Sequence, residues 1–194
     1  HALQNVKNDK VLRLTMLFHD MGKPVMKTTD ENGRDHFKGH AIASEQIAKT
    51  VMKRLKFDND TIRKVTKLVA YHDYRMEPTG ANVRRAMHEI GVELFPYYLA
   101  VRLADTKAQS SYERRGKLEN IIQIRELYRN ALRNKECVTL KDLAVTGTDL
   151  INLGIAPGKK LGTLLNELLD MVIEDPAWNQ KEKLCDYVKE RFGF

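Results

Sequence analysis

The sequence has little of what crosslinks a chain or anchors it in a membrane. Only two cysteines occur, Cys137 and Cys185, and they form no CxxC pair, which argues against a disulfide framework. No stretch approaches the roughly 18 consecutive apolar residues of a membrane-spanning helix, and the N-terminus shows no basic-then-apolar signal pattern. We therefore predict a cytoplasmic protein with reduced thiols and no membrane partner. The chain begins with His1 instead of Met, which indicates an excised fragment.

Sheet-forming patterns are also missing. No run of alternating apolar and polar residues is long enough to predict a sheet, and no internal repeat or low-complexity linker occurs. Apolar residues instead return at the spacing of amphipathic helices in segments 11–18, 41–55, 60–73, 83–90, 94–108 and 118–132. Segment 27–38 is polar, and residues 30–33 predict the tip of a short loop or hairpin. The sequence thus predicts an all-α fold with a main helical domain, residues 1–134, and a smaller helical tail, residues 135–194.

Positive charge is concentrated in the first three quarters of the chain. Residues 1–150 contain 27 Lys and Arg against 19 Asp and Glu, a balance of +8, whereas residues 151–194 contain 6 against 7. Such an excess favours a polyanionic partner, because each phosphate that a cation neutralises releases a condensed counterion. Charge alone fits an ordinary mildly basic protein equally well, so the choice depends on motifs.

Histidine and aspartate residues form the chemically distinctive series. His19 and Asp20 are adjacent at the end of the first predicted helix, where both can turn toward one ion. His40, His72 and Asp105 lie on separate predicted helices, and a helical bundle can bring such side chains together. A lone histidine is more commonly a surface or hydrogen-bonded core residue, but a buried carboxylate at Asp105 would be costly without a cation. The series therefore predicts a divalent metal site.

Motifs in this series follow the order found in a known family. Residues 17–24 are LFHDMGKP, residues 36–40 are HFKGH, and residues 146–162 are TGTDLINLGIAPGKKLG. The first two resemble the LLHDIGKP and HFYGH elements of the HD superfamily as it occurs in bacterial CCA-adding tRNA nucleotidyltransferases, which are related to poly(A) polymerases. His72 and Asp105 match that family's later histidine and its closing aspartate. The third motif resembles the GxDLIxLGxxPGPxxG element of those enzymes' C-terminal RNA-binding region, so the resemblance covers nearly the whole chain.

The resemblance implies the tRNA-contacting body of a CCA-adding enzyme, with an HD-type metal-dependent phosphohydrolase site. Two departures limit what carries over. The sequence has no glycine-rich strand-turn followed by a DxD carboxylate pair, so the nucleotidyltransferase head is not expected in these residues. The family's first ligand histidine precedes an AL pair. If Ala2 and Leu3 are that pair, the histidine lies upstream of His1, and in the other register His1 is the ligand.

In the site that the resemblance implies, His19, Asp20 and Asp105 hold one divalent ion together with the family's first histidine. Mg, Mn, Ni, Co and Zn are all candidates. The ion would polarise a phosphoryl oxygen of a phosphate-ester substrate and lower the pKa of a bound water. His40 and His72 either complete a second metal site or contact the phosphate.

Further cations are candidates for phosphate and RNA contacts. Lys23 either neutralises charge that develops in phosphoryl transfer or is a solvated lysine. Lys159 and Lys160 follow a glycine- and proline-rich turn, so backbone N–H groups, the helix dipole and both ammonium groups could face an RNA phosphate. Turns that only pack helices together use the same residue types. Arg84 and Arg85 either track an RNA backbone or form an ordinary solvated helix face.

Two other functional classes stay open. One is an independent HD phosphohydrolase that acts on nucleotides or cyclic phosphates, which the gene upstream of His1 would distinguish by lacking a nucleotidyltransferase head. The other is a non-catalytic RNA-binding scaffold with a vestigial HD site. A site that stays empty under excess metal would favour that scaffold.

Overall fold

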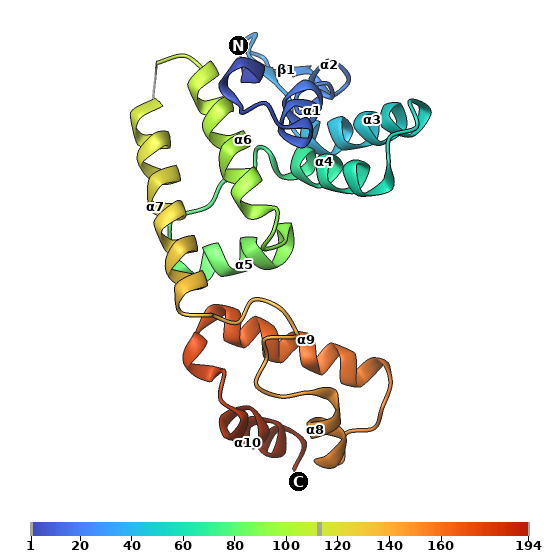
Figure 1. The fold of residues 1–194 in the computed structure, drawn as a ribbon, viewed down its shortest axis with the longest axis vertical. Helices are drawn as coiled ribbons and strands as arrows, with labels where there is room; N and C mark the ends of the chain where they lie inside the picture. Colours follow the sequence, from blue (N-terminus) through green and yellow to red (C-terminus); the bar gives the residue numbers. More distant parts are fainter. Residues whose placement is uncertain (1, 112–113, 194) are drawn as a thin grey trace. The chain divides into compact units, whose positions relative to one another are not determined.

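The computed structural model describes residues 2–111 and 114–193, and helices make up most of this part of the chain (Figure 1). The all-α prediction is confirmed, because every segment predicted as helical forms a helix whose ends shift by only a few residues. The α-helices are Lys10–Phe18 (α1), Lys23–Met26 (α2), His40–Arg54 (α3), Asn59–Tyr71 (α4), Gly80–Ile90 (α5), Phe95–Ala108 (α6), Arg114–Arg133 (α7), Gly147–Asn152 (α8), Lys159–Glu174 (α9) and Lys181–Phe192 (α10). Two short 3-10 helices are Ala2–Asn5 (η1) and Pro176–Trp178 (η2). None of the helices in the described ranges is both long and apolar enough to cross a membrane.

A small hairpin interrupts the helices where the polar segment predicts one. Thr28–Thr29 (β1) pairs antiparallel with Asp35–His36 (β2), with Thr28 opposite His36. Gly33 in the connecting turn has a φ of 73°, a conformation that glycine adopts without steric cost. The predicted hairpin tip at residues 30–33 is therefore confirmed.

The described residues form two compact units whose segments alternate along the chain. The first unit contains residues up to Met76 together with Ile90–Gln123, and the second contains Glu77–Glu89 and the residues from Ile124 onward. Compactness alone assigns no function to either unit. A functional division into residues 1–134 and 135–194 therefore stays a prediction.

In the first unit, α1 packs against α3, α4 and α6. Phe18 at the end of α1 contributes to a buried cluster with Met52 of α3 and Val65 of α4. Leu12 and Met16, earlier on α1, belong to a second buried cluster with residues of α6. The C-terminal end of α1 lies near the start of α3 and the end of α4, because Asp20, just after α1, approaches His40 and His72.

The second unit has its core along α9. Leu168 and Val172 of α9 are fully buried and pack with Leu150 of α8 and Leu184 of α10. The apolar spacing along α9 produces this buried face, as expected of an amphipathic helix. The start of α9 is left at the surface, and this places Lys159 and Lys160 in solvent.

Candidate metal centre

Helix ends present the three histidines of the predicted site. His19 is the C-cap of α1, His72 is the C-cap of α4, and His40 is the first residue of α3. The apolar faces of these helices pack together, and the packing brings their polar ends to one place. The structure therefore brings together histidine side chains that are far apart in the sequence.

A backbone carbonyl fixes one nitrogen of each ring. The Nδ1–H groups of His19, His40 and His72 donate to carbonyl oxygens three residues earlier, at 2.9, 2.9 and 2.7 Å. Because a carbonyl oxygen only accepts, each Nδ1 must carry a proton, and Nε2 of the neutral ring keeps its lone pair. A carbonyl partner on the distal nitrogen is typical of metal-binding histidines.

The three Nε2 atoms converge on Asp20. The Oδ1 atom of Asp20 lies 3.5 Å from Nε2 of His40 and 3.6 Å from Nε2 of His72. The Oδ2 atom lies 3.3 Å from Nε2 of His19. Ligand atoms of Asp20, His40 and His72 all lie within 4.8 Å of one another. Nε2 of His40 is 3.1 Å from Nε2 of His72, and two lone pairs at that distance repel unless a proton or a metal cation offsets them.

Asp105 joins the cluster through His19. Its Oδ1 lies 3.7 Å from Nε2 of His19, and its Oδ2 accepts a 2.7 Å hydrogen bond from Nε2 of Gln109. Burial of the ring lowers the pKa of His19, but hydrogen bonds with Asp105 and Asp20 outweigh burial and raise that pKa to about 9. Burial also works to raise the pKa of Asp105, yet its hydrogen bond with His19 holds it below the ordinary value. Asp20 and Asp105 thus both lie beside His19, but the described group whose ligand atoms all lie within 4.8 Å of one another is Asp20, His40 and His72. Whether His19, Asp20 and Asp105 hold one ion stays a prediction.

Asp20 is a half-buried carboxylate next to a lysine. Burial favours its protonated form, but hydrogen bonds with His19 and His72 hold the pKa of Asp20 well below its usual range. The ammonium of Lys23 lies 2.7 Å from Oδ2 of Asp20 and 5.9 Å from the centroid of the Phe37 ring. Lys23 is therefore held at the edge of the cluster.

A pocket of about 350 Å³ opens beside the cluster. It is lined by Asp20, Lys23, His40, His72 and Asp105, and also by Phe37, Lys38, Asp73, Arg75 and Gln109. Sequence reasoning missed Arg75 and Gln109. Gln109 lies four residues after Asp105 on one predicted helix, and that spacing could have shown that the two side chains are neighbours. Arg75 follows α4 in an irregular segment, where no periodicity predicts its direction.

Gly22 lets the turn after α1 approach the start of α3. A Cβ atom on Gly22 would lie 2.4 Å from the carbonyl oxygen of His40 and 2.6 Å from the backbone nitrogen of Ser44. The Gly22 N–H also donates to the Ser44 hydroxyl at 2.8 Å. Gly22 therefore allows the close backbone contact that places His40 beside Asp20.

The predicted RNA-binding arginines differ in their surroundings. Arg84 is buried, and its guanidinium donates to the carbonyl oxygens of Ile173 and Glu174 and to the carboxylate of Glu136, at 2.7, 3.0 and 2.8 Å. It therefore binds the C-terminal end of α9 and has few donors left for a phosphate. Arg85 is exposed and forms an ion pair with the Glu174 carboxylate at 3.1 Å. Sequence reasoning could not separate these two neighbours.

Lys159 and Lys160 begin α9, as the sequence predicts. Both side chains are exposed. Gly158 precedes them with a φ of 133°, and no side chain caps the helix at this position. The first backbone N–H groups of α9 are therefore open beside two ammonium groups. Gly162 lies inside α9 and not in the turn.

His1 lies outside the described residues. Ala2 and Leu3 belong to η1, which packs against α6. The structure therefore leaves both registers of the first ligand histidine open.

The fold and the site together define an all-α protein with a cluster of histidines and aspartates at its helix ends. The chain belongs to the tRNA nucleotidyltransferase family, because the family model for tRNA nucleotidyltransferase domain 2 matches residues 40–188. It is also 28% identical over 176 residues to the CC-adding tRNA nucleotidyltransferase of Thermus thermophilus. That match covers 88% of this chain but 38% of the relative, so the chain spans well under half the relative's length. No solved structure matches the chain. The resemblance to tRNA nucleotidyltransferases found in the sequence is confirmed.

Proposed function

We propose that this chain is the tRNA-contacting body of a CCA-adding tRNA nucleotidyltransferase, and that its histidine–aspartate cluster is an HD-type divalent metal site with phosphohydrolase activity. The observation that carries the metal site is the 3.1 Å approach of Nε2 of His40 to Nε2 of His72, with both atoms also close to Asp20. Family membership supports the tRNA-contacting role.

The donor set fits a divalent cation. Imidazole nitrogens and carboxylate oxygens together suit borderline and hard divalent ions. His19, Asp20 and Asp105 would hold one ion, as the resemblance implies. His40 and His72, whose Nε2 atoms converge with Asp20, would either hold a second ion or contact the phosphate. The negative charges of the two carboxylates would offset the charge of one ion, which makes the buried cluster electrostatically stable.

The residues around the ion have separate tasks in phosphate-ester hydrolysis. A bound divalent ion supplies a Lewis acid for a phosphoryl oxygen. The backbone carbonyls at Nδ1 keep the three rings in one tautomer and direction. Lys23, at the edge of the pocket, would neutralise negative charge on the phosphate as it reacts. The sequence contains no nucleotidyltransferase head motif, so we assign no transfer of CTP or ATP to this chain.

The test is metal-dependent hydrolysis of 2′,3′-cyclic AMP by the chain after removal of metal with EDTA. We expect turnover to depend on an added divalent ion, with Mn²⁺, Ni²⁺, Co²⁺, Zn²⁺ and Mg²⁺ compared separately. His40→Ala should reduce turnover by about 10-fold or more, because it removes one converging donor. His36→Ala is the matched control, since His36 is exposed on β2 and pairs with Asp30 at 2.8 Å.

The outcomes separate a metal-dependent phosphohydrolase from a non-catalytic scaffold. Binding of an ion without hydrolysis would favour a non-catalytic RNA-binding scaffold. No binding of any of the five ions would reject the metal site. Equal turnover by wild type and His40→Ala would remove His40 from the site.

A further inference from the structure

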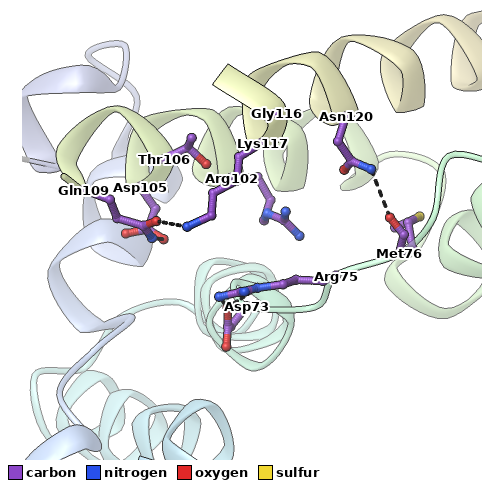
Figure 2. Close-up of a pocket in the computed structure, with 10 residues that line it drawn as sticks. All are labelled: Asp73, Arg75, Met76, Arg102, Asp105, Thr106, Gln109, Gly116, Lys117 and Asn120. Atoms are coloured by element: carbon purple, nitrogen blue, oxygen red, sulfur yellow. Dashed lines mark hydrogen bonds and ion pairs between the residues drawn. The ribbon is translucent and has the colours of Figure 1, made fainter. Parts of the chain in front are cut away.

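A second pocket, of about 220 Å³, adjoins the metal centre between α6, α7 and the segment after α4 (Figure 2). It shares Asp73, Arg75, Asp105 and Gln109 with the pocket beside the histidine cluster. Asp105 therefore faces both spaces, and a ligand held at the cluster has room to extend into the second one. We name this space the arginine pocket. Its other lining residues are Met76, Arg102, Thr106, Gly116, Lys117 and Asn120.

Arg102 is the buried cation of the arginine pocket. The residue is only 9% exposed. Its Nη1 atom donates to two neutral acceptors, the Tyr74 carbonyl and the Tyr98 hydroxyl. Within residues 2–111 and 114–193, no carboxylate lies at ion-pair distance from it. Figure 2 shows the guanidinium directed into the pocket, toward Arg75. A buried guanidinium without a counter-charge is costly, and an anion in the pocket would remove that cost.

Lys117 extends this positive charge toward the metal centre. Its ammonium donates to Oε1 of Gln109 at 3.0 Å, and Nε2 of Gln109 donates to Asp105 at 2.7 Å (Figure 2). One neutral amide thus separates the ammonium from a carboxylate of the proposed metal site. A lysine has three N–H donors, and in the described part of the chain this ammonium uses one of them.

We propose that the arginine pocket binds a second phosphate group of a substrate whose first phosphate lies at the histidine cluster. The lining cations Arg75, Arg102 and Lys117 outnumber the carboxylates Asp73 and Asp105, and a divalent ion would offset the charge of Asp105. Guanidinium and ammonium groups suit phosphate oxygens. No lining residue described for this pocket is aromatic, so it lacks the stacking surface that nucleobase sites use.

This inference rests on the proposed function and narrows its substrate class. The substrate would carry two neighbouring phosphates, as both a 3′-phosphorylated RNA end and a free nucleoside 3′,5′-bisphosphate do. The two sources share the chemistry that the pocket recognises, and the ligands of the test distinguish them.

The test is calorimetric titration of the full chain with adenosine 3′-monophosphate and adenosine 3′,5′-bisphosphate, each with and without Mn²⁺. We expect the bisphosphate to bind about tenfold more tightly, as one or two charge-assisted hydrogen bonds would give. Equal affinities for the monophosphate and the bisphosphate would overturn the proposal that the arginine pocket binds a second phosphate. The 3′-phosphorylated dinucleotide of adenosine is the third ligand. Tighter binding of the dinucleotide than of the bisphosphate indicates an RNA end, and the reverse order indicates a free nucleotide.

Two variants locate the effect. Lys117→Met removes the ammonium and keeps a side chain of similar length. Gly116→Leu adds a bulky side chain at a lining position where an added Cβ meets no atom within 4 Å, so it should narrow the pocket without a clash at Cβ. Each variant should bind the bisphosphate no more tightly than the monophosphate, and its affinity for the monophosphate should stay within about twofold of the wild-type value. Arg115→Met is the control, since Arg115 is exposed, pairs with Glu119 and does not line the pocket.

Binding of Mn²⁺ separates this inference from the proposed function. If Mn²⁺ binds and both variants keep the bisphosphate advantage, the arginine pocket is rejected and the metal site stands. If Mn²⁺ does not bind but Lys117→Met abolishes the advantage, the pocket stands and the metal site is rejected. If neither Mn²⁺ binding nor a bisphosphate advantage is measured, both proposals fail.

Discussion

Asp20 is the single residue on which the proposed chemistry depends most. Its Oδ1 faces His40 and His72, and its Oδ2 faces His19 and Lys23. We expect Asp20→Asn to weaken Mn²⁺ binding by more than about 10-fold, because the amide removes the negative charge that offsets the ion. Asparagine has nearly the same shape, so the fold should persist. Titration calorimetry measures the affinity, and circular dichroism measures the helix content.

The matched control for Asp20 is Asp73→Asn. Asp73 lines the same pocket but forms an ion pair with exposed Arg75 at 3.1 Å. It is not within ion-pair distance of the described histidines, so this variant should bind Mn²⁺ as the wild type does. Unchanged affinity in Asp20→Asn would remove Asp20 from the ligand set.

At the scale of elements, the contact between the turn after α1 and the start of α3 aligns the cluster. Gly22→Ala would place a Cβ atom 2.4 Å from the His40 carbonyl oxygen, so α3 must shift. We expect a loss of about 1–3 kcal/mol in the free energy of unfolding, as overpacked sites show. Mn²⁺ binding should weaken as well, since the shift moves His40 away from Asp20. Denaturant unfolding and Mn²⁺ titration of the variant measure the two effects.

Gly162→Ala controls for the loss of a glycine. Gly162 lies inside α9, and an added Cβ there meets no atom within 4 Å. Its replacement should raise the free energy of unfolding by about 0.5–1 kcal/mol, because alanine favours a helix interior. A Gly22→Ala protein as stable as the wild type would show that the close approach is not needed.

The N-terminus of α8 should show a pH-dependent contribution to stability. Thr146 and Asp149 form a capping box, and Lys181 of α10 pairs with the Asp149 carboxylate at 2.6 Å. Hydrogen bonds from Lys181 and Thr146 lower the pKa of Asp149 from 3.8 to about 2. A lowered pKa stabilises the fold above pH 3.8, and that contribution is lost as the pH falls toward 2.

We therefore expect Asp149→Asn to unfold at a lower temperature than the wild type at pH 6. The difference should shrink as the pH falls from about 4 to about 2, the interval between the ordinary and the lowered pKa. Thermal unfolding followed by circular dichroism gives the two curves. Asp170→Asn, which changes an exposed carboxylate of α9, should show no such convergence. If the unfolding temperatures of Asp149→Asn and the wild type differed by the same amount at every pH in this interval, the result would contradict the lowered pKa of Asp149.

Helices α1 and α3 to α7 were predictable from the sequence because each has apolar residues that return every three to four positions. The short helix α2, which buries no residue, was not predicted. The short hairpin was predictable from its turn residues. That His19 lies beside both Asp20 and Asp105 was implied by the family resemblance more than by spacing. Contacts that depend on packing between distant segments were not predictable. Arg84 is one example, since it donates to the carbonyl of Ile173, 89 positions away. Gly22 is another, because its role depends on how closely α3 approaches.

At the scale of the whole molecule, charge is the property most relevant to RNA. The chain carries a formal net charge of +7, and the excess lies in residues 1–150. Phosphate neutralisation is therefore expected to supply most of the affinity for tRNA. Binding by the chain alone should be weak, poorly specific and strongly dependent on salt.

The cations at the start of α9 allow the sharpest test of this expectation. Lys159 and Lys160 are exposed beside uncapped backbone N–H groups, which together form an arrangement suited to a phosphate. Replacing both lysines with Ala should lower tRNA affinity and reduce the slope of log K against log salt by about one to two units, since each lost phosphate contact removes about 0.7 to 0.9 of a unit. Filter binding at several salt concentrations measures both quantities.

Arg85→Ala is the comparison, because Arg85 is an exposed cation, whereas replacing buried Arg84 would also disturb the end of α9. Arg85 already pairs with Glu174, so its replacement should change the slope less than the double lysine replacement does. Circular dichroism of both variants should match the wild type, which separates lost RNA contacts from lost folding. If the lysine variant keeps its full affinity and slope while Arg85→Ala loses both, the turn before α9 only packs the chain. The RNA path would then run over α5, and the phosphate contacts would have to come from the cations of that helix.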